Sequence, residues 1–135
     1  MCGNNATHFS KKNILVTNIA IDTTVTKIEK VLTISELSSS TKLIEEIQAY
    51  LTANDFSVSL VRLKDLKEII IVNSYKYSEF HKLIPIITED VNNLSKKVNE
   101  AKTIKIQKIR ENLETIKTEI IKIKITLNPL YHDNR

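Results

Sequence analysis

The chain has 135 residues, a formal net charge of +4 and a single cysteine, Cys2. This length allows one domain with a modest core. A content of 41% apolar and 27% charged residues is typical of a folded domain rather than a disordered one. The lone cysteine excludes an internal disulfide framework and a cysteine zinc site, and the lone glycine, Gly3, excludes a glycine-rich phosphate loop.

The compartment has two interpretations. A chain with one cysteine is most simply a cytoplasmic protein. The start Cys2-Gly3-Asn4-Asn5 also resembles that of a mature bacterial lipoprotein, so the alternative is a lipid-anchored surface binding protein whose signal peptide was removed before Cys2. No run of 18 apolar residues occurs in the sequence, and we therefore expect no membrane span.

Residues 1–12 are polar and are expected to form a flexible N-terminal arm. The stretch NILVTNIAI at 13–21 is short, apolar and rich in β-branched side chains, which predicts a buried strand. Asp22-Thr23-Thr24 then offers helix N-cap side chains. A helix is predicted from there to about Leu37 because four apolar residues follow at helical spacing, namely Val25, Ile28, Val31 and Leu32.

Ser38-Ser39-Ser40 predicts a break, and the apolar spacing after it predicts a second helix over residues 41–52. Apolar and polar residues alternate at 56–61, which is the period of a strand. The EIIIVN stretch at 68–73 is typical of a strand that is buried on both faces.

The C-terminal third carries two apolar runs whose members step by threes and fours, the spacing of one helix face. The first run is Phe80, Ile84, Ile87, Val91, Leu94, Val98 and Ala101. The second run, here called the C-terminal seam, is Ile106, Ile109, Leu113, Ile116, Ile120, Ile123 and Leu127. The two runs do not share one register, so either a single helix absorbs a skipped residue or the chain leaves the helix near Lys102. In the second case residues 103–107 are expected to form a further strand.

This order of elements predicts an α+β fold, with a small split βαβ sheet of the ferredoxin-like kind and a long C-terminal amphipathic helix. The expected divisions are a flexible arm at 1–12, an α+β domain at 13–107, the amphipathic helix at 108–127 and a tail at 128–135. An all-α helical bundle is the alternative, because three residues of the predicted strand region also fit one face of a helix, namely Leu60, Leu63 and Ile70.

Two stretches resemble the RNA recognition motif family. The segment Ile14-Leu15-Val16-Thr17-Asn18-Ile19 is similar to that family's first-strand box, and Lys67-Glu68-Ile69-Ile70-Ile71-Val72 is similar to its third-strand box. The resemblance implies a ferredoxin-like fold that binds RNA on its sheet. At the positions of the family's base-stacking aromatic residues this chain has Leu15, Ile69 and Ile71, and aliphatic side chains have no π-face on which a base can stack.

No pattern in the sequence points to catalysis, so we expect no enzyme, no catalytic or cofactor-binding residue, no cofactor and no metal site. His8, His81 and His132 are too far apart for a metal-ligand spacing. Glu45-Glu46 and Glu89-Asp90 are pairs of adjacent carboxylates, which point away from each other on a helix. Both pairs are interpreted as solvated charges.

The first functional hypothesis is protein–protein interaction or assembly through the C-terminal seam. A helix over residues 106–127 spans about 33 Å at 1.5 Å per residue. Its three heptads are marginally stable without another element packed against them. An exposed isoleucine stripe of this kind requires a cover. We therefore expect the seam to dock on a protein partner or on a second copy of the chain.

The second hypothesis is binding of RNA or another nucleic acid. Residues 95–135 carry ten basic and five acidic side chains, whereas residues 1–94 carry ten and eleven. Lysine and arginine side chains can contact phosphate groups, although such a cluster is also common on the solvated face of a helix. The predicted contacts lie in the basic 96–110 segment and are Lys96, Lys97, Lys102, Lys105, Lys108 and Arg110.

Overall fold

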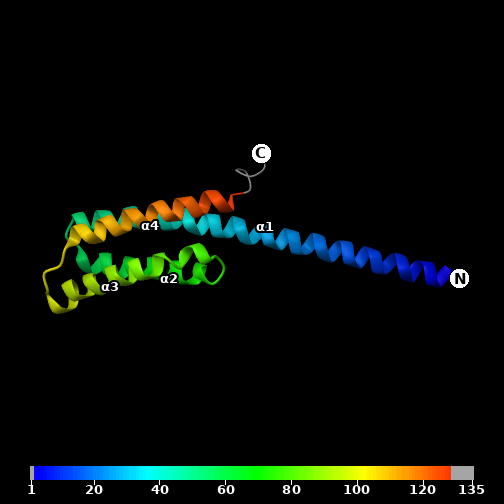
Figure 1. Ribbon diagram of the computed structural model, residues 1–135, viewed down its shortest axis with the longest axis horizontal. Helices are drawn as coiled ribbons and strands as arrows, with labels where there is room; N and C mark the ends of the chain where they lie inside the picture. The colour runs from blue at the N-terminus through cyan, green and yellow to red at the C-terminus, as the bar shows by residue number, and fades with distance from the viewer. Residues whose placement is uncertain (1, 129–135) are drawn as a thin grey trace. The chain divides into compact units, whose positions relative to one another are not determined.

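A computed structural model describes residues 2–128 of the chain, with side chains from Thr23 onward. The elements in order are α1 (Cys2–Thr52), α2 (Phe56–Ser74), the short 3₁₀ helix η1 (Ser78–Phe80), α3 (Leu83–Glu100) and α4 (Ile106–Leu127) (Figure 1). No strand occurs between residues 2 and 128. The predicted α+β, ferredoxin-like fold is therefore wrong, and the alternative, an all-helical bundle, describes the protein.

The chain divides into two compact units, Met1–Thr33 and Ile34–Arg135. In the first unit, all ten side chains from Thr23 to Leu32 are exposed. The second unit contains the remainder of α1 together with α2, α3 and α4. It holds every buried apolar side chain in the part of the chain with described side chains.

Within the second unit, the helices form an antiparallel ring in which each helix contacts the next and α4 returns to α1, the arrangement of a four-helix bundle. Polar and aromatic contacts connect each neighbouring pair. The contacts that show this order are Glu46–Arg62 for α1 and α2, Phe56–Lys97 for α2 and α3, Asp90–Asn112 for α3 and α4, and Glu45–Lys117 for α1 and α4.

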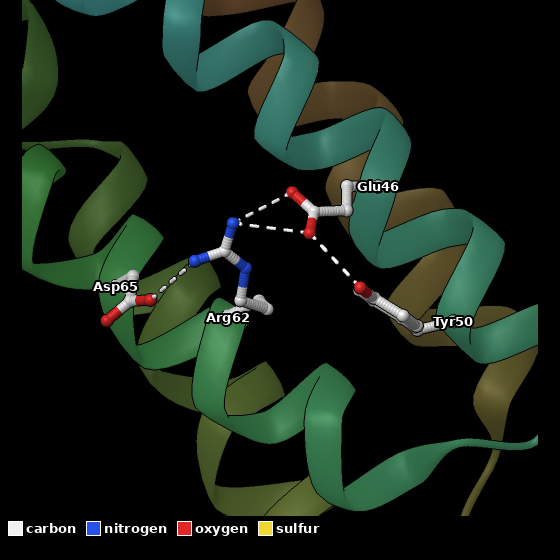
Figure 2. A network of polar contacts seen from close by, with 4 residues as sticks. All are labelled: Glu46, Tyr50, Arg62 and Asp65. Atoms are coloured by element: carbon white, nitrogen blue, oxygen red, sulfur yellow. Dashed lines mark hydrogen bonds and ion pairs between the residues drawn. The ribbon is translucent and has the colours of Figure 1, made fainter.

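Figure 2 shows the polar network between α1 and α2. The Arg62 Nη2 atom lies 2.9 and 3.2 Å from the two carboxylate oxygens of Glu46, and Arg62 Nη1 lies 3.3 Å from Asp65 Oδ2. The Tyr50 hydroxyl donates a hydrogen bond to the same Glu46 carboxylate. The hydrogen bond from Arg62 lowers the pKa of Glu46. Glu46, which was interpreted as a solvated charge, therefore forms an ion pair that aligns α1 with α2.

The core consists of apolar side chains that recur at helical spacing on all four helices. On α1 the fully buried Ser40 interrupts this stripe, and its small side chain allows close packing. The buried apolar residues are Leu37, Ile44, Ile47 and Leu51 on α1, Leu60, Leu63, Leu66 and Ile70 on α2, Phe80 on η1, Leu83, Ile87, Val91 and Leu94 on α3, and Ile109, Leu113, Ile116, Ile120 and Ile123 on α4.

The strand predictions failed because β-branched composition is a weaker signal than the spacing of buried residues. Residues 13–21 lie within α1, and both 56–61 and 68–73 lie within α2. β-propensity reflects packing context, so an amphipathic face overrides it. The two stretches that resemble the RNA recognition motif boxes are thus helical, and the sheet implied by that resemblance is absent between residues 2 and 128.

The serine-rich break predicted at residues 38–40 is also absent. The hydroxyls of Ser39 and Ser40 donate hydrogen bonds to the carbonyl oxygens of Ser35 and Glu36, at 3.2 and 2.9 Å. Because these bonds satisfy the hydroxyls within the helix, α1 continues through the stretch. The same helix begins at Cys2, where the sequence predicted a flexible arm at 1–12.

The change of register between the two C-terminal runs marks a real boundary. The chain leaves the helix after Glu100 and re-enters one at Ile106, with residues 101–105 as a non-helical connection (yellow in Figure 1). The strand expected at 103–107 does not form. The amphipathic helix predicted at 108–127 is α4, which begins two residues earlier, and residues 129–135 of the expected tail lie outside the described residues.

Replacing Ile116 with Ala is expected to lower the free energy of unfolding by about 2–5 kcal/mol, because the seam residue is fully buried and its truncation leaves a cavity. Ile125 on the same helix is 46% exposed and is the matched control. Ile125→Ala should change stability by no more than about 0.5 kcal/mol. Urea denaturation measures both values, and equal effects at the two positions would contradict the buried seam.

Candidate functional site

The structure places the C-terminal seam inside the protein's own core. Five of its seven residues are at most 5% exposed, and Ile106 and Leu127 pack partly buried at its two ends. The face that was expected to require a partner is therefore covered within the chain. The hypothesis of docking through this seam loses the exposed stripe that motivated it.

The six basic residues predicted to contact nucleic acid separate into two groups. Lys97 lies over the ring of Phe56, with its Nζ 5.4 Å from the ring centre. Arg110 donates hydrogen bonds to Gln48 and Thr52 of α1. These two residues connect helices of the bundle, whereas the remaining four line a single pocket of about 450 Å³, namely Lys96, Lys102, Lys105 and Lys108.

The pocket lies where α3 passes to α4, and the local backbone explains why lysines gather there. Ala101 adopts a left-handed conformation with φ 53°, which ends α3 and turns the chain. The amides of Ala101 and Lys102 both donate to the carbonyl oxygen of Lys96. Ile104 packs against the core, while the neighbouring Thr103 and Lys105 are exposed. The connection is thus anchored by Ile104, and its polar side chains, Lys102, Thr103 and Lys105, line the pocket.

The electrostatics of the pocket favour an anion. Its lining carries four ammonium groups and one carboxylate, Glu89, with Asn93 and Thr103 as neutral hydrogen-bonding groups. Lys102 also pairs with Glu100 at 3.3 Å, but both side chains are more than half exposed, and such a pair is weak. The N-terminus of α4 follows directly, and the amides of a first helical turn carry partial positive charge. Four like charges around one hollow are repulsive unless an anion lies between them.

A buried carboxyl lies beside this pocket, and sequence reasoning missed it. Asp90 is fully buried, although the pair Glu89-Asp90 was interpreted as solvated charges. The spacing of the apolar residues in this part of the sequence does indicate that Asp90 lies on a buried face. When the run is counted from Leu83 instead of Ile84, the residues Leu83, Ile87, Asp90 and Leu94 form one buried face of α3. The Oδ1 atom of Asp90 accepts a hydrogen bond of 2.7 Å from the side-chain amide of Asn112 on α4.

Other kinds of site are not found in the described part of the chain. No three side chains of the metal-binding types gather there, and none of its helices combines the length and hydrophobicity of a membrane span. The ring nitrogen Nε2 of His81 lies 2.9 Å from the carbonyl oxygen of Ser74. The side chains of Cys2, His8 and His132 lie outside the described residues.

Comparisons of the chain with protein-family models, with curated proteins and with solved structures give no match. The function is therefore inferred from the geometry and charge of the pocket.

Sulfate is expected to raise the melting temperature by more than sodium chloride of equal ionic strength, because an anion among the four ammonium groups relieves their repulsion. Sulfate also stabilises proteins generally. The decisive quantity is therefore the excess, defined as the rise in melting temperature in sulfate minus the rise in sodium chloride, measured in two double variants. The excess should vanish in Lys102→Glu/Lys105→Glu and persist in Lys64→Glu/Lys67→Glu, which places the same charge change at the same spacing on α2. An equal excess in both variants would contradict an anion site at the pocket.

Proposed function

We propose that this protein is a non-enzymatic module that binds the phosphate backbone of single-stranded RNA in its lysine-lined pocket. The observation that carries the proposal is the convergence of four lysines, from α3, the 101–105 connection and α4, on one hollow. Phosphate contacts of this kind supply most of the affinity in sequence-independent nucleic-acid binding.

A second hollow supports a chain-like ligand over a small free anion. This hollow, of about 550 Å³, shares Glu89, Asn93 and Lys96 with the lysine-lined pocket, and it continues along α3. Ile84 and Pro85 give it an apolar surface, and the other lining residues are Thr88 and Asn92. The two hollows together form a track in which a phosphate lies among the lysines and an adjoining nucleotide lies along α3.

The composition of the track indicates how selective the binding is. Neither hollow is lined by an aromatic residue, so bases have no stacking platform, and stacking is worth about 1–3 kcal/mol per base where it occurs. Contacts to phosphates position a nucleic acid without reading its sequence. The proposed binding is therefore tolerant of sequence and strongly dependent on salt.

Self-association is a second candidate function, and it is favoured by an exposed apolar face on the first unit. Four apolar side chains of α1 are 47–63% exposed, namely Val25, Ile28, Val31 and Leu32. The β-branched residues threonine, valine and isoleucine dominate this part of the helix. Because their helix propensity is low, this part of α1 depends on packing for its stability. A second copy of the chain offers the same face in a two-fold arrangement, which makes the contact self-complementary. We therefore propose that the chain self-associates through this face of α1 and not through the C-terminal seam.

Binding of a fluorescent single-stranded RNA should weaken by about 50-fold between 50 and 200 mM salt, as expected for four phosphate contacts with a logarithmic slope of about −0.7 each. Fluorescence anisotropy across a salt titration measures this slope. Lys102→Glu/Lys105→Glu should reduce the magnitude of the slope by about 1.4 and weaken binding at low salt by about tenfold or more.

The matched control for this measurement is Lys64→Glu/Lys67→Glu on α2, which changes the net charge equally and leaves the pocket intact. It should retain the wild-type slope. No binding at low salt, or an equal loss in the two double variants, would contradict RNA binding in the pocket.

Sedimentation equilibrium should show reversible dimers at high micromolar concentration. Ile28→Asp/Leu32→Asp should abolish them, because two carboxylates on the apolar face oppose its burial. Ile121→Asp/Ile125→Asp on α4, which also replaces two exposed aliphatic residues with aspartates, is the control and should still dimerise. A wild-type protein that stays monomeric would contradict association through this face.

A further inference from the structure

Asp90 is a buried titratable group that RNA binding by the pocket does not use. It lies on α3 with no exposed surface, and its Oδ2 atom has no hydrogen-bond partner, the only buried side-chain oxygen or nitrogen of this kind in the described part of the chain. A buried, unsatisfied polar atom in a native fold calls for an explanation.

The surroundings of Asp90 consist of one neutral donor and two charged groups. Asn112 of α4 donates a hydrogen bond to its Oδ1 atom. The charged groups acting on it are Glu89 of its own helix and Lys108 of α4, and no charged side chain of α1 or α2 acts on it within the described residues. Burial is the main reason that the pKa of Asp90 is raised from 3.8 to about 7, and Asn112 and Lys108 oppose this rise.

We propose that Asp90 is a pH-sensitive latch between α3 and α4, which is closed while its carboxyl is neutral and loosened when the carboxyl ionises. The neutral form lies in the interface with one hydrogen bond to Asn112. The ionised form leaves a charge in a site with no partner for its second oxygen. The contact between the two helices therefore weakens as the pH rises.

The latch is coupled to the lysine-lined pocket by residues that belong to both. Glu89, which precedes Asp90, and Lys108, which lies one helical turn before Asn112, both line the pocket. An ionised Asp90 attracts Lys108 and withdraws an ammonium group from the pocket. This consequence rests on the proposed function, whereas the latch itself does not, and it predicts that RNA binds more weakly above the midpoint of the latch than below it.

The sign of the pH dependence follows from the direction of the pKa shift. Because the folded protein binds this proton more tightly than the unfolded chain does, the stability contributed by Asp90 is fully present below about pH 4, falls as the pH rises towards 7 and is absent above that range. Hydrogen bonds from Arg62 and Lys82 lower the pKa values of Glu46 and Glu119, so the contribution of these two carboxyls to stability changes with pH in the opposite direction to that of Asp90. A variant that changes Asp90 alone and retains every other titratable group is therefore the proper comparison.

The wild-type protein should melt about 10 °C lower at about pH 8 than at about pH 5. Asp90→Asn, which mimics the neutral carboxyl, should melt higher than the wild type at pH 8 and lose most of this difference. Glu89→Gln, which removes the adjacent exposed carboxyl, should retain it. A pH dependence in Asp90→Asn equal to that of the wild type would overturn the latch.

Nuclear magnetic resonance of the wild-type protein provides a test that needs no variant to fold. The carboxyl carbon of Asp90 should titrate with a midpoint near 7, and the amide signals of residues 102–108 should shift with the same midpoint. A midpoint below about 5 would overturn the proposal. Neither measurement contains RNA, so failure of RNA binding counts against the proposed function alone, whereas failure of the titration counts against the latch alone.

Discussion

The burial of one layer of isoleucine and leucine side chains among four helices is the interaction on which the rest of the structure depends. Each fully buried side chain of this kind stabilises the fold by about 1.5–3 kcal/mol. The seam of α4 contributes five of the eighteen buried apolar residues in the described part of the chain, and the net stability of a typical small domain, about 5–15 kcal/mol, is what remains after such burial offsets the conformational entropy of the chain. Separation of α4 from the bundle is therefore equivalent to unfolding the domain.

This layer also creates the site. With the apolar face of α4 fixed against the bundle, the antiparallel order of α3 and α4 brings Lys108 near Lys96. Lys102 and Lys105 are confined to the five-residue connection between the two helices. The left-handed Ala101 and the inward-facing Ile104 then leave this connection little freedom. A concentration of positive charge that the core does not need is thus held in place by the core, which is a reason to assign it a binding role.

Few polar side chains lie among the buried apolar ones, and they differ in how many of their polar atoms have a hydrogen-bond partner. Asn73 is nearly fully buried and donates hydrogen bonds to a carboxylate oxygen of Glu36 and to the carbonyl oxygen of Ile69, so its amide group is well paired. Asp90 has one partner for two oxygens. Sites that break the rules of a stable core are frequently functional ones, and Asp90 adjoins the pocket while Asn73 does not.

The sequence allowed the helices of the C-terminal third and the helical course of residues 22–37 and 41–52 to be predicted, whereas it was misleading at 13–21, 56–61 and 68–73. From Phe80 onward the apolar residues follow helical spacing, and the two runs correspond to η1 with α3 and to α4. The change of register between the runs left a continuous helix and a strand at 103–107 open, and it marks the non-helical connection at 101–105. At 13–21 and 68–73 the same β-branched residues that favour strands also fit a helix face, and tertiary packing decides between them.

The limits of the site prediction have a similar origin. The lysines were visible in the sequence, but which four converge depends on the register between α3 and α4 and on the conformation of Ala101. The burial of Asp90 depends on a one-residue choice in the register of α3, between Leu83 and Ile84. The seam was correctly predicted as one helix face, and only the identity of its cover, the chain's own helices, required the structure.

Hydrogen–deuterium exchange of the α4 amides on dilution tests most directly whether the chain covers its own seam. The structure predicts that the amides from Ile109 to Ile123 exchange only with global unfolding, as slowly as those of α3, and that their rates are unchanged by a roughly hundredfold dilution. Protection of α4 that decreases on dilution, while α3 remains protected, would show that a second molecule covers the seam and would contradict the account.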